Sequence, residues 1–127
     1  MKIEPYKQLD GIDLNTSSKD IIAEVGLLST VRQNDIGFTE YDFGKYVFRF
    51  ESSGNLSEVT ADCPSVDLET QTVLFEELEA FVKRSDPQYF DKLGFLVSPR
   101  YGIAFDPDCS PWVTVLTSSG LLCWKNV

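Results

Sequence analysis

An alternating aromatic segment most constrains the fold of this chain. Tyr46, Phe48 and Phe50 alternate with Val47 and Arg49. Successive side chains of a β-strand point to opposite faces, so this pattern predicts a strand with three aromatic rings on one face. Rings of this size need to be covered by other elements, which favours a sheet packed on a well-filled core.

The flanking segments extend this strand into a predicted meander. Residues 38–43 are rich in strand formers and are followed by Gly44-Lys45, a plausible tight turn. Residues 52–55 read Ser-Ser-Gly-Asn, which is turn composition, and residues 56–61 read as the returning strand. We therefore expect three consecutive antiparallel strands in the middle of the chain.

Local signals predict helices on either side of this meander. Residues 17–25 begin with Ser17, which can cap a helix, and Gly26 can end it with a positive φ. Residues 72–84 place apolar side chains at helical spacing, with glutamates early and basic residues late, as the helix dipole favours. The pair Asp86-Pro87 predicts a further short helix over residues 88–93.

The last third of the chain reads as strands again. The segments are 95–97, 102–105, 112–117 and, as a closing edge, 121–124. Helices placed between runs of hairpin-connected strands indicate an α+β fold. We therefore predict a single domain over residues 1–127, with a mainly antiparallel sheet of about five to six strands and two to three helices.

Composition excludes several classes of function. The 127 residues contain no histidine, and their formal net charge is -9. Without histidine there is no Ser-His-Asp or Cys-His nucleophile pair, and no phosphate-binding or nucleophile-elbow motif is present. The acidic balance disfavours nucleic acid, and the three scattered cysteines do not form a zinc motif. We expect a cytoplasmic binding protein, a monomer or weak dimer, with no enzymatic activity, cofactor, metal or membrane contact.

Acidic residues are the candidate binding groups. They form three sets: Glu40 and Asp42 on one face of a strand, Glu76, Glu77 and Glu79 on a helix, and Asp106 and Asp108 in the loop 106–111. Each set could present negative charge to a basic partner. Each could equally be a solvated face or, for the loop, ordinary turn chemistry.

Two segments resemble a known group of proteins. The first is Tyr46-x-Phe48-x-Phe50 followed by a Gly turn and Leu56. The second is Tyr101-Gly-Ile-Ala-Phe-Asp106 followed by Trp112-Val-Thr-Val115. Together with the short acidic chain, they are similar to the bacterial immunity proteins of contact-dependent inhibition and related polymorphic toxin systems. The resemblance implies a protein that binds one cognate toxin domain and blocks its active site or functional surface.

These observations predict an inhibitor of a basic toxin of the nuclease type, because an acidic surface complements a phosphate-binding one. The alternative is a small-molecule-binding or regulatory domain whose aromatic sheet face lines a pocket. A small enzyme that uses carboxylates is a third hypothesis, which lacks a residue pair at a defined spacing.

Overall fold

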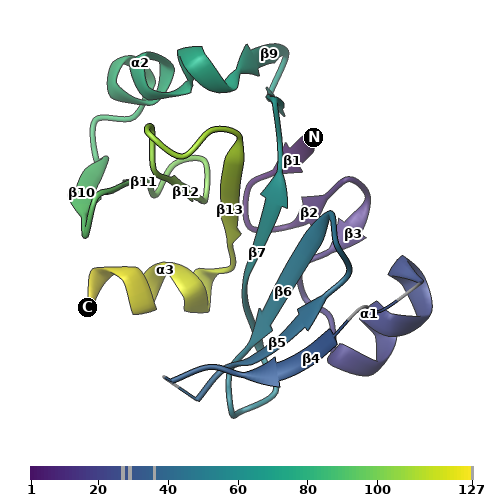
Figure 1. Cartoon of the computed structure of the whole chain (residues 1–127). Helices are drawn as coiled ribbons and strands as arrows, with labels where there is room; N and C mark the ends of the chain where they lie inside the picture. The colour runs from purple at the N-terminus through teal and green to yellow at the C-terminus, as the bar shows by residue number, and fades with distance from the viewer. Residues whose placement is uncertain (27, 29, 36, 127) are drawn as a thin grey trace.

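The larger of two sheets contains eight strands and forms the frame of the molecule (Figure 1). The computed structural model describes residues 1–26, 28, 30–35 and 37–126. The neighbouring strands of this sheet pair antiparallel in the order β10-β11-β12-β13-β7-β6-β5-β4. Their bounds are β4 Thr30–Gln33, β5 Thr39–Asp42, β6 Tyr46–Phe50, β7 Leu56–Asp62, β10 Phe90–Lys92, β11 Phe95–Ser98, β12 Ile103–Phe105 and β13 Trp112–Leu116.

The second sheet has five short strands in the order β3-β2-β1-β8-β9. They are β1 Lys2–Glu4, β2 Gln8–Leu9, β3 Ile12–Asp13, β8 Ser65–Leu68 and β9 Gln71–Leu74. Only the β1–β8 pair among them is parallel. The prediction of a mainly antiparallel α+β fold is confirmed, but its five to six strands are too few for the described part of the chain. The extra strands come mostly from residues 2–13 and 65–74, where each strand has only two to four residues.

One apolar core joins the two sheets. Ile3 and Leu9 of the small sheet are buried in the same cluster as Phe48 and Val59 of the large sheet. The predicted meander is confirmed as β5, β6 and β7, and its aromatic face is part of this core. Phe48 and Phe50 are buried, and Tyr46 packs against them from the edge of the cluster. The side chains between these rings therefore point to the opposite face of the large sheet.

Helix α1 (Ser18–Val25) forms where the sequence predicts it. Ser17 caps it, since its Oγ accepts a hydrogen bond from the Asp20 N–H over 3.2 Å. Gly26 follows the helix with φ 99°, a conformation that glycine adopts without steric cost. Ile21 is fully buried and anchors the helix to the core.

The second predicted helix begins later than its apolar spacing suggests. Residues 71–74 belong to β9, which pairs with β8, and helix α2 covers Phe75–Ser85. The buried side chains of α2 include Leu78, Phe81 and Val82, as the spacing predicts. The predicted start is wrong because residues 71–74 pair with β8 across a tight turn, and this pairing outweighs their local helix preference.

The predicted short helix over residues 88–93 is wrong. Residues 90–92 form β10, which pairs with β11 through a turn at Leu93 and Gly94. Asp86 is the C-cap of α2 and not the N-cap of a further helix. Its carboxylate is buried and accepts hydrogen bonds from the Ser98 hydroxyl and the Arg100 N–H, so it ties this segment to a distant turn.

The predicted edge strand at residues 121–124 is also wrong. These residues lie in helix α3 (Ser118–Lys125), which Thr117 caps by accepting a hydrogen bond from the Gly120 N–H. The helix packs across the face of the large sheet that is opposite the main core (Figure 1). It covers a small apolar cluster that contains Val97, Ala104 and Leu116. The described residues contain three helices in total, and none is long and apolar enough to cross a membrane.

Candidate functional site

Helix α3 covers only half of its sheet face, and the other half carries a ladder of charged side chains. In the strand register, Arg32 of β4 lies opposite Glu40 of β5, Glu40 opposite Arg49 of β6, and Arg49 opposite Glu58 of β7. Directly opposed residues share a face of the sheet. Arg49, which lies between the buried rings of Phe48 and Phe50 along β6, therefore belongs to one continuous row of alternating charge that crosses four strands.

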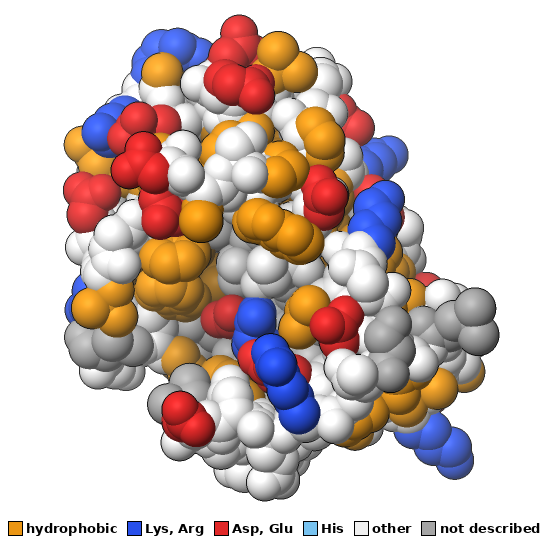
Figure 2. All heavy atoms as spheres, viewed as in Figure 1, with side chains coloured by type: hydrophobic (Ala, Val, Ile, Leu, Met, Phe, Trp, Pro, Cys, Tyr) orange, Lys and Arg blue, Asp and Glu red, His pale blue; other side chains and the backbone are white. Residues whose placement is uncertain are grey.

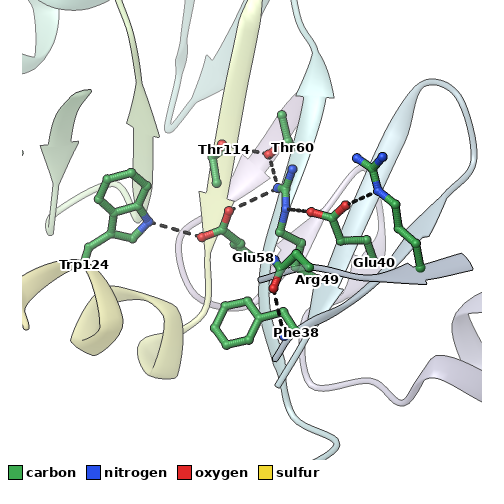
Figure 3. A network of polar contacts seen from close by, with 9 residues as sticks. Phe38, Glu40, Arg49, Glu58, Thr60, Thr114 and Trp124 are labelled. Carbon is green, nitrogen blue, oxygen red and sulfur yellow. Dashed lines mark hydrogen bonds and ion pairs between the residues drawn. The ribbon is translucent and has the colours of Figure 1, made fainter. Parts of the chain in front are cut away.

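Short ion pairs connect this row (Figure 3). Glu40 accepts from the Nε of Arg32 at Oε1 and from the Nε of Arg49 at Oε2, each over 2.7 Å. Arg49 also reaches Glu58, with 3.1 Å between Nη1 and Oε2. The side chain of Glu40 is only 8% exposed, whereas that of Arg32 is 75% exposed. Of the four side chains in the row, only Arg32 on β4 is mostly exposed.

Further polar groups surround the buried end of the row. Arg49 Nη1 donates to the Thr60 hydroxyl over 2.6 Å, and Thr60 shares a hydrogen bond of 2.9 Å with Thr114. The indole N–H of Trp124 in α3 donates to Glu58 Oε1 over 3.3 Å (Figure 3). Glu58 therefore links the charged row to the helix.

The pKa values of the two glutamates of the row shift in opposite directions. Burial opposes ionisation of Glu40, but hydrogen bonds from Arg32 and Arg49 outweigh it and lower the pKa of this carboxyl. Burial raises the pKa of Glu58, and the single guanidinium of Arg49 with the Trp124 N–H only partly offsets it. Glu58 is therefore the group of this row that protonates first as pH falls.

Two adjoining hollows lie beside this row and share Arg49, Glu58 and Trp124. The outer hollow has a volume of about 380 Å³ and is also lined by Phe38, Leu93 and Cys123. The inner hollow has a volume of about 240 Å³ and is also lined by Phe95, Asp106 and Trp112. We call the two together the groove. Figure 2 shows this face hollowed between hydrophobic side chains and the red and blue ones in the middle of the view.

The first predicted acidic set lies on this face, but its charge is largely neutralised. Glu40 and Asp42 do share one face of β5, and Glu58 of β7 lies on the same side of the sheet. Glu40 and Glu58 are both paired with Arg49. Asp42 is half-buried and accepts the Gly44 N–H over 2.8 Å, which stabilises the β5–β6 turn. Glu40 is thus a structural ion-pair partner rather than an exposed acidic group.

The second set lies on α2. Glu76, Glu77 and Glu79 are all exposed. Glu77 Oε1 accepts the Leu74 N–H over 3.4 Å at the start of the helix, and Glu79 lies 3.2 Å from Lys83 one turn later. Glu76 and Glu77 occupy the first turn, where the helix dipole favours negative charge.

The third set lies in the loop between β12 and β13, close to the start of α2. The rings of Phe75 in α2 and Phe105 in β12 pack edge to face with centroids 5.9 Å apart. The Cys63 N–H donates to the carbonyl of Pro111, and the Phe75 N–H donates to the carbonyl of Pro64. These contacts bring the two segments to the same end of the molecule. We call the group formed by Glu76, Glu77, Asp106 and Asp108 the acidic rim.

The loop 106–111 has the hydrogen bonding of an ordinary turn, which is one of the two interpretations that the sequence allowed. Asp106 Oδ1 accepts the Asp108 N–H over 2.9 Å. Asp108 is exposed, whereas Asp106 is half-buried and lines the inner hollow. Asp106 is therefore the predicted site residue that the structure places at the groove. Among the described residues, no group of three or more Cys, Asp or Glu side chains is placed to hold a metal ion.

Sequence reasoning missed Arg49 and Trp124 as members of the candidate site, and it treated Glu58 only as part of a possible acidic surface beside Glu40 and Asp42. One signal could have found the pairing of Arg49 with Glu58. If the turn at residues 52–55 joins β6 to β7, the two side chains come close to each other with opposite charge. Trp124 could not be placed, because it reaches Glu58 from a helix where a strand was predicted.

No family model, curated protein or solved structure matches the chain. The case for a function therefore depends on the residues of the groove and the acidic rim alone.

Proposed function

We propose that this protein is an immunity protein, which binds a cognate bacterial toxin and blocks its active site or functional surface. The single observation that carries this proposal is an open, partly aromatic groove with Asp106 in its lining and the other carboxylates of the acidic rim on neighbouring segments, in a chain with a formal net charge of -9. The rim offers charge for attracting a partner, and the groove offers apolar surface for holding it.

Electrostatics supports a basic partner, most simply a nuclease domain. Such a domain holds phosphates with Lys and Arg, so an acidic inhibitor is attracted to the surface that it must block. Glu76 and Glu77 from α2, with Asp106 and Asp108 from the β12–β13 loop, place four carboxylates at one end of the molecule. Steering of this kind weakens as salt is added.

Exposed apolar side chains at the groove supply candidate anchors. Leu93 is 77% exposed and Trp112 is 42% exposed. Each lines one of the two hollows. Binding energy at protein interfaces is concentrated in a few such residues, and tryptophan is enriched among them. The proposed interface therefore combines a charged periphery with two apolar contacts.

A small-molecule-binding domain is the second candidate, and one observation favours it. The outer hollow, at about 380 Å³, falls within the range of ligand pockets. This candidate needs a different location from the one predicted, because the aromatic face of β6 is packed into the core. A metabolite that raises the melting temperature would support it.

The proposal is tested with the product of the neighbouring reading frame, purified and titrated with this protein by calorimetry. We expect binding that weakens as salt is raised, and loss of toxin activity in the complex. A neighbouring product with no toxin-like activity, or no binding at low salt, contradicts the proposal. A melting-temperature screen on the same sample tests the second candidate in parallel.

A further inference from the structure

We propose that the inner hollow is a binding site for one arginine side chain of the partner, with its guanidinium between tryptophan rings and beside Asp106. This inference rests on the proposed function, and it assigns the chemistry of the partner group that enters the groove. It is carried by three properties of the hollow: its aromatic walls, its charge and its size.

Aromatic side chains form the walls. Trp124 packs on Phe95 with ring centroids 5.1 Å apart and an interplanar angle of 46°. Trp112 is two residues before Thr114 on β13, so both face the open side of the sheet, and it remains 42% exposed. A guanidinium is planar and weakly hydrated, and it stacks on aromatic faces with an attraction that grows as water is excluded.

The charge of the lining favours a cation over an anion. Arg32 and Arg49 are matched in charge by Glu40 and Glu58, with which they form ion pairs. Asp106 adds one negative charge that this row does not neutralise. Its Oδ1 already accepts the Asp108 N–H, and a carboxylate has capacity for further donors. A guanidinium entering the hollow would therefore meet a carboxylate at its wall.

The size of the hollow indicates one side chain rather than a cofactor. Its volume of about 240 Å³ is smaller than the roughly 300 to 1,000 Å³ of common small-molecule pockets. Arginine fits the lining better than lysine does, because its flat fork can stack and donate two hydrogen bonds at once. Lysine offers a compact, strongly hydrated charge that uses aromatic walls less well.

The two tryptophans make the test direct, because the chain contains only Trp112 and Trp124 and both line the inner hollow. We would titrate the full chain with Nα-acetyl-arginine amide and follow the two indole N–H signals by NMR. We expect both signals to shift in a saturable way. Nα-acetyl-citrulline amide has nearly the same shape without the charge, and it should shift them far less.

Variants locate the site. Asp106→Asn keeps the acceptor for the Asp108 N–H, and should weaken binding of the arginine amide about two- to fivefold, as for a partly exposed ion pair. Trp112→Ala should weaken it by a similar factor through lost stacking. Asp20→Asn, on α1 at the other side of the sheet, should leave binding unchanged. Equal shifts with citrulline, no saturable shift, or equal weakening by Asp20→Asn overturns the inference.

The same variants separate this inference from the proposed function. If the toxin binds but Asp106→Asn and Trp112→Ala leave its affinity unchanged, the arginine site is wrong and the immunity function stands. If the arginine amide binds as expected and the neighbouring gene product does not bind, the hollow recognises a guanidinium and the immunity function is wrong.

Discussion

Arg49 lies directly opposite Glu58 in the β6–β7 pairing, and its Nη1 is 3.1 Å from Glu58 Oε2. The same guanidinium holds Glu40 through Nε. One arginine, 23% exposed, therefore forms ion pairs with two carboxylates that are even less exposed than it is. This relationship makes Arg49 the centre of the polar face and leads to the first two predictions.

Replacement of Arg49 by Met should strongly destabilise the fold. The substitution leaves Glu58 without its guanidinium and Glu40 with only the exposed Arg32. Removing one partner of a buried pair leaves an uncompensated charge, and we expect a loss of about 3 kcal/mol in the free energy of unfolding. Urea unfolding at neutral pH measures this loss.

Arg32→Met is the matched control for this experiment. Arg32 is mostly exposed, so its ion pair with Glu40 is screened by water, and its loss should destabilise the protein far less. Equal losses in the two variants would show that burial of the row does not set the strength of its ion pairs.

Glu40→Gln and Glu58→Gln should change the pH dependence of stability in opposite directions. The pKa of Glu40 is lowered in the folded state, so its contribution to stability is present above the ordinary glutamate pKa and is lost as pH falls below it. The pKa of Glu58 is raised, so the folded state holds the proton more tightly, and stability is lost as pH rises from the ordinary value through the raised one.

Urea unfolding from neutral pH to about pH 3 tests this prediction, since the range spans the ordinary glutamate pKa. As pH rises, the stability of the wild type relative to Glu40→Gln should increase. Its stability relative to Glu58→Gln should decrease. Parallel pH profiles for the two variants would be incompatible with the unequal environments described above.

The sequence allowed prediction of the elements whose signals are local. The Ser17 cap and Gly26 bound α1, and period-2 alternation located β6, because neighbouring residues decide both. The predictions for the start of α2 and for the whole of α3 were wrong, because both elements depend on pairing or packing with distant segments. Within the candidate site, the shared face of Glu40 and Asp42 follows from strand periodicity. Burial of Glu40 depends on partners from two other strands, which periodicity does not reveal.

The β10–β11 turn offers a stabilising substitution. Leu93 has φ 54° and Gly94 has φ 86°, so both central residues of this hairpin turn have positive φ. Such turns favour Asn-Gly, and a non-glycine residue other than Asn or Asp is strained there. Because Leu93 is 77% exposed, Leu93→Asn should raise the free energy of unfolding by about 1 kcal/mol. Thermal unfolding would show a higher midpoint, and a lower one would contradict this turn geometry.

Gly120 is required where α3 meets β7. A Cβ at this position would overlap the carbonyl oxygen of Ser57, which is backbone and cannot move aside. Gly120→Ala should therefore displace α3, weaken the contact between Trp124 and Glu58, and destabilise the protein by about 3 kcal/mol. Ser118→Ala, at an exposed position of the same helix, is the control and should leave the tryptophan fluorescence and the stability close to wild type. A similar response from both variants would refute the close approach.

Under the proposed function, the acidic rim should control how fast the protein associates with a basic toxin domain. Asp106→Asn with Asp108→Asn removes two rim charges, while the amide oxygen introduced at position 106 can still accept the backbone hydrogen bond from position 108. We expect slower association at low salt, by about two- to fivefold for each charge removed, and a weaker dependence of the rate on salt. Stopped-flow measurements with the purified toxin domain would give both quantities.

The control for the rim must change net charge equally at another place. Asp20→Asn with Glu24→Gln does so on α1, whose buried Ile21 packs into the core on the other side of the large sheet. If location matters, this variant should associate almost as fast as the wild type, because charges more than about 10 Å from the partner are screened at ordinary ionic strength. If both double variants slow association equally, the overall charge of -9 attracts the toxin and the rim has no special part in binding.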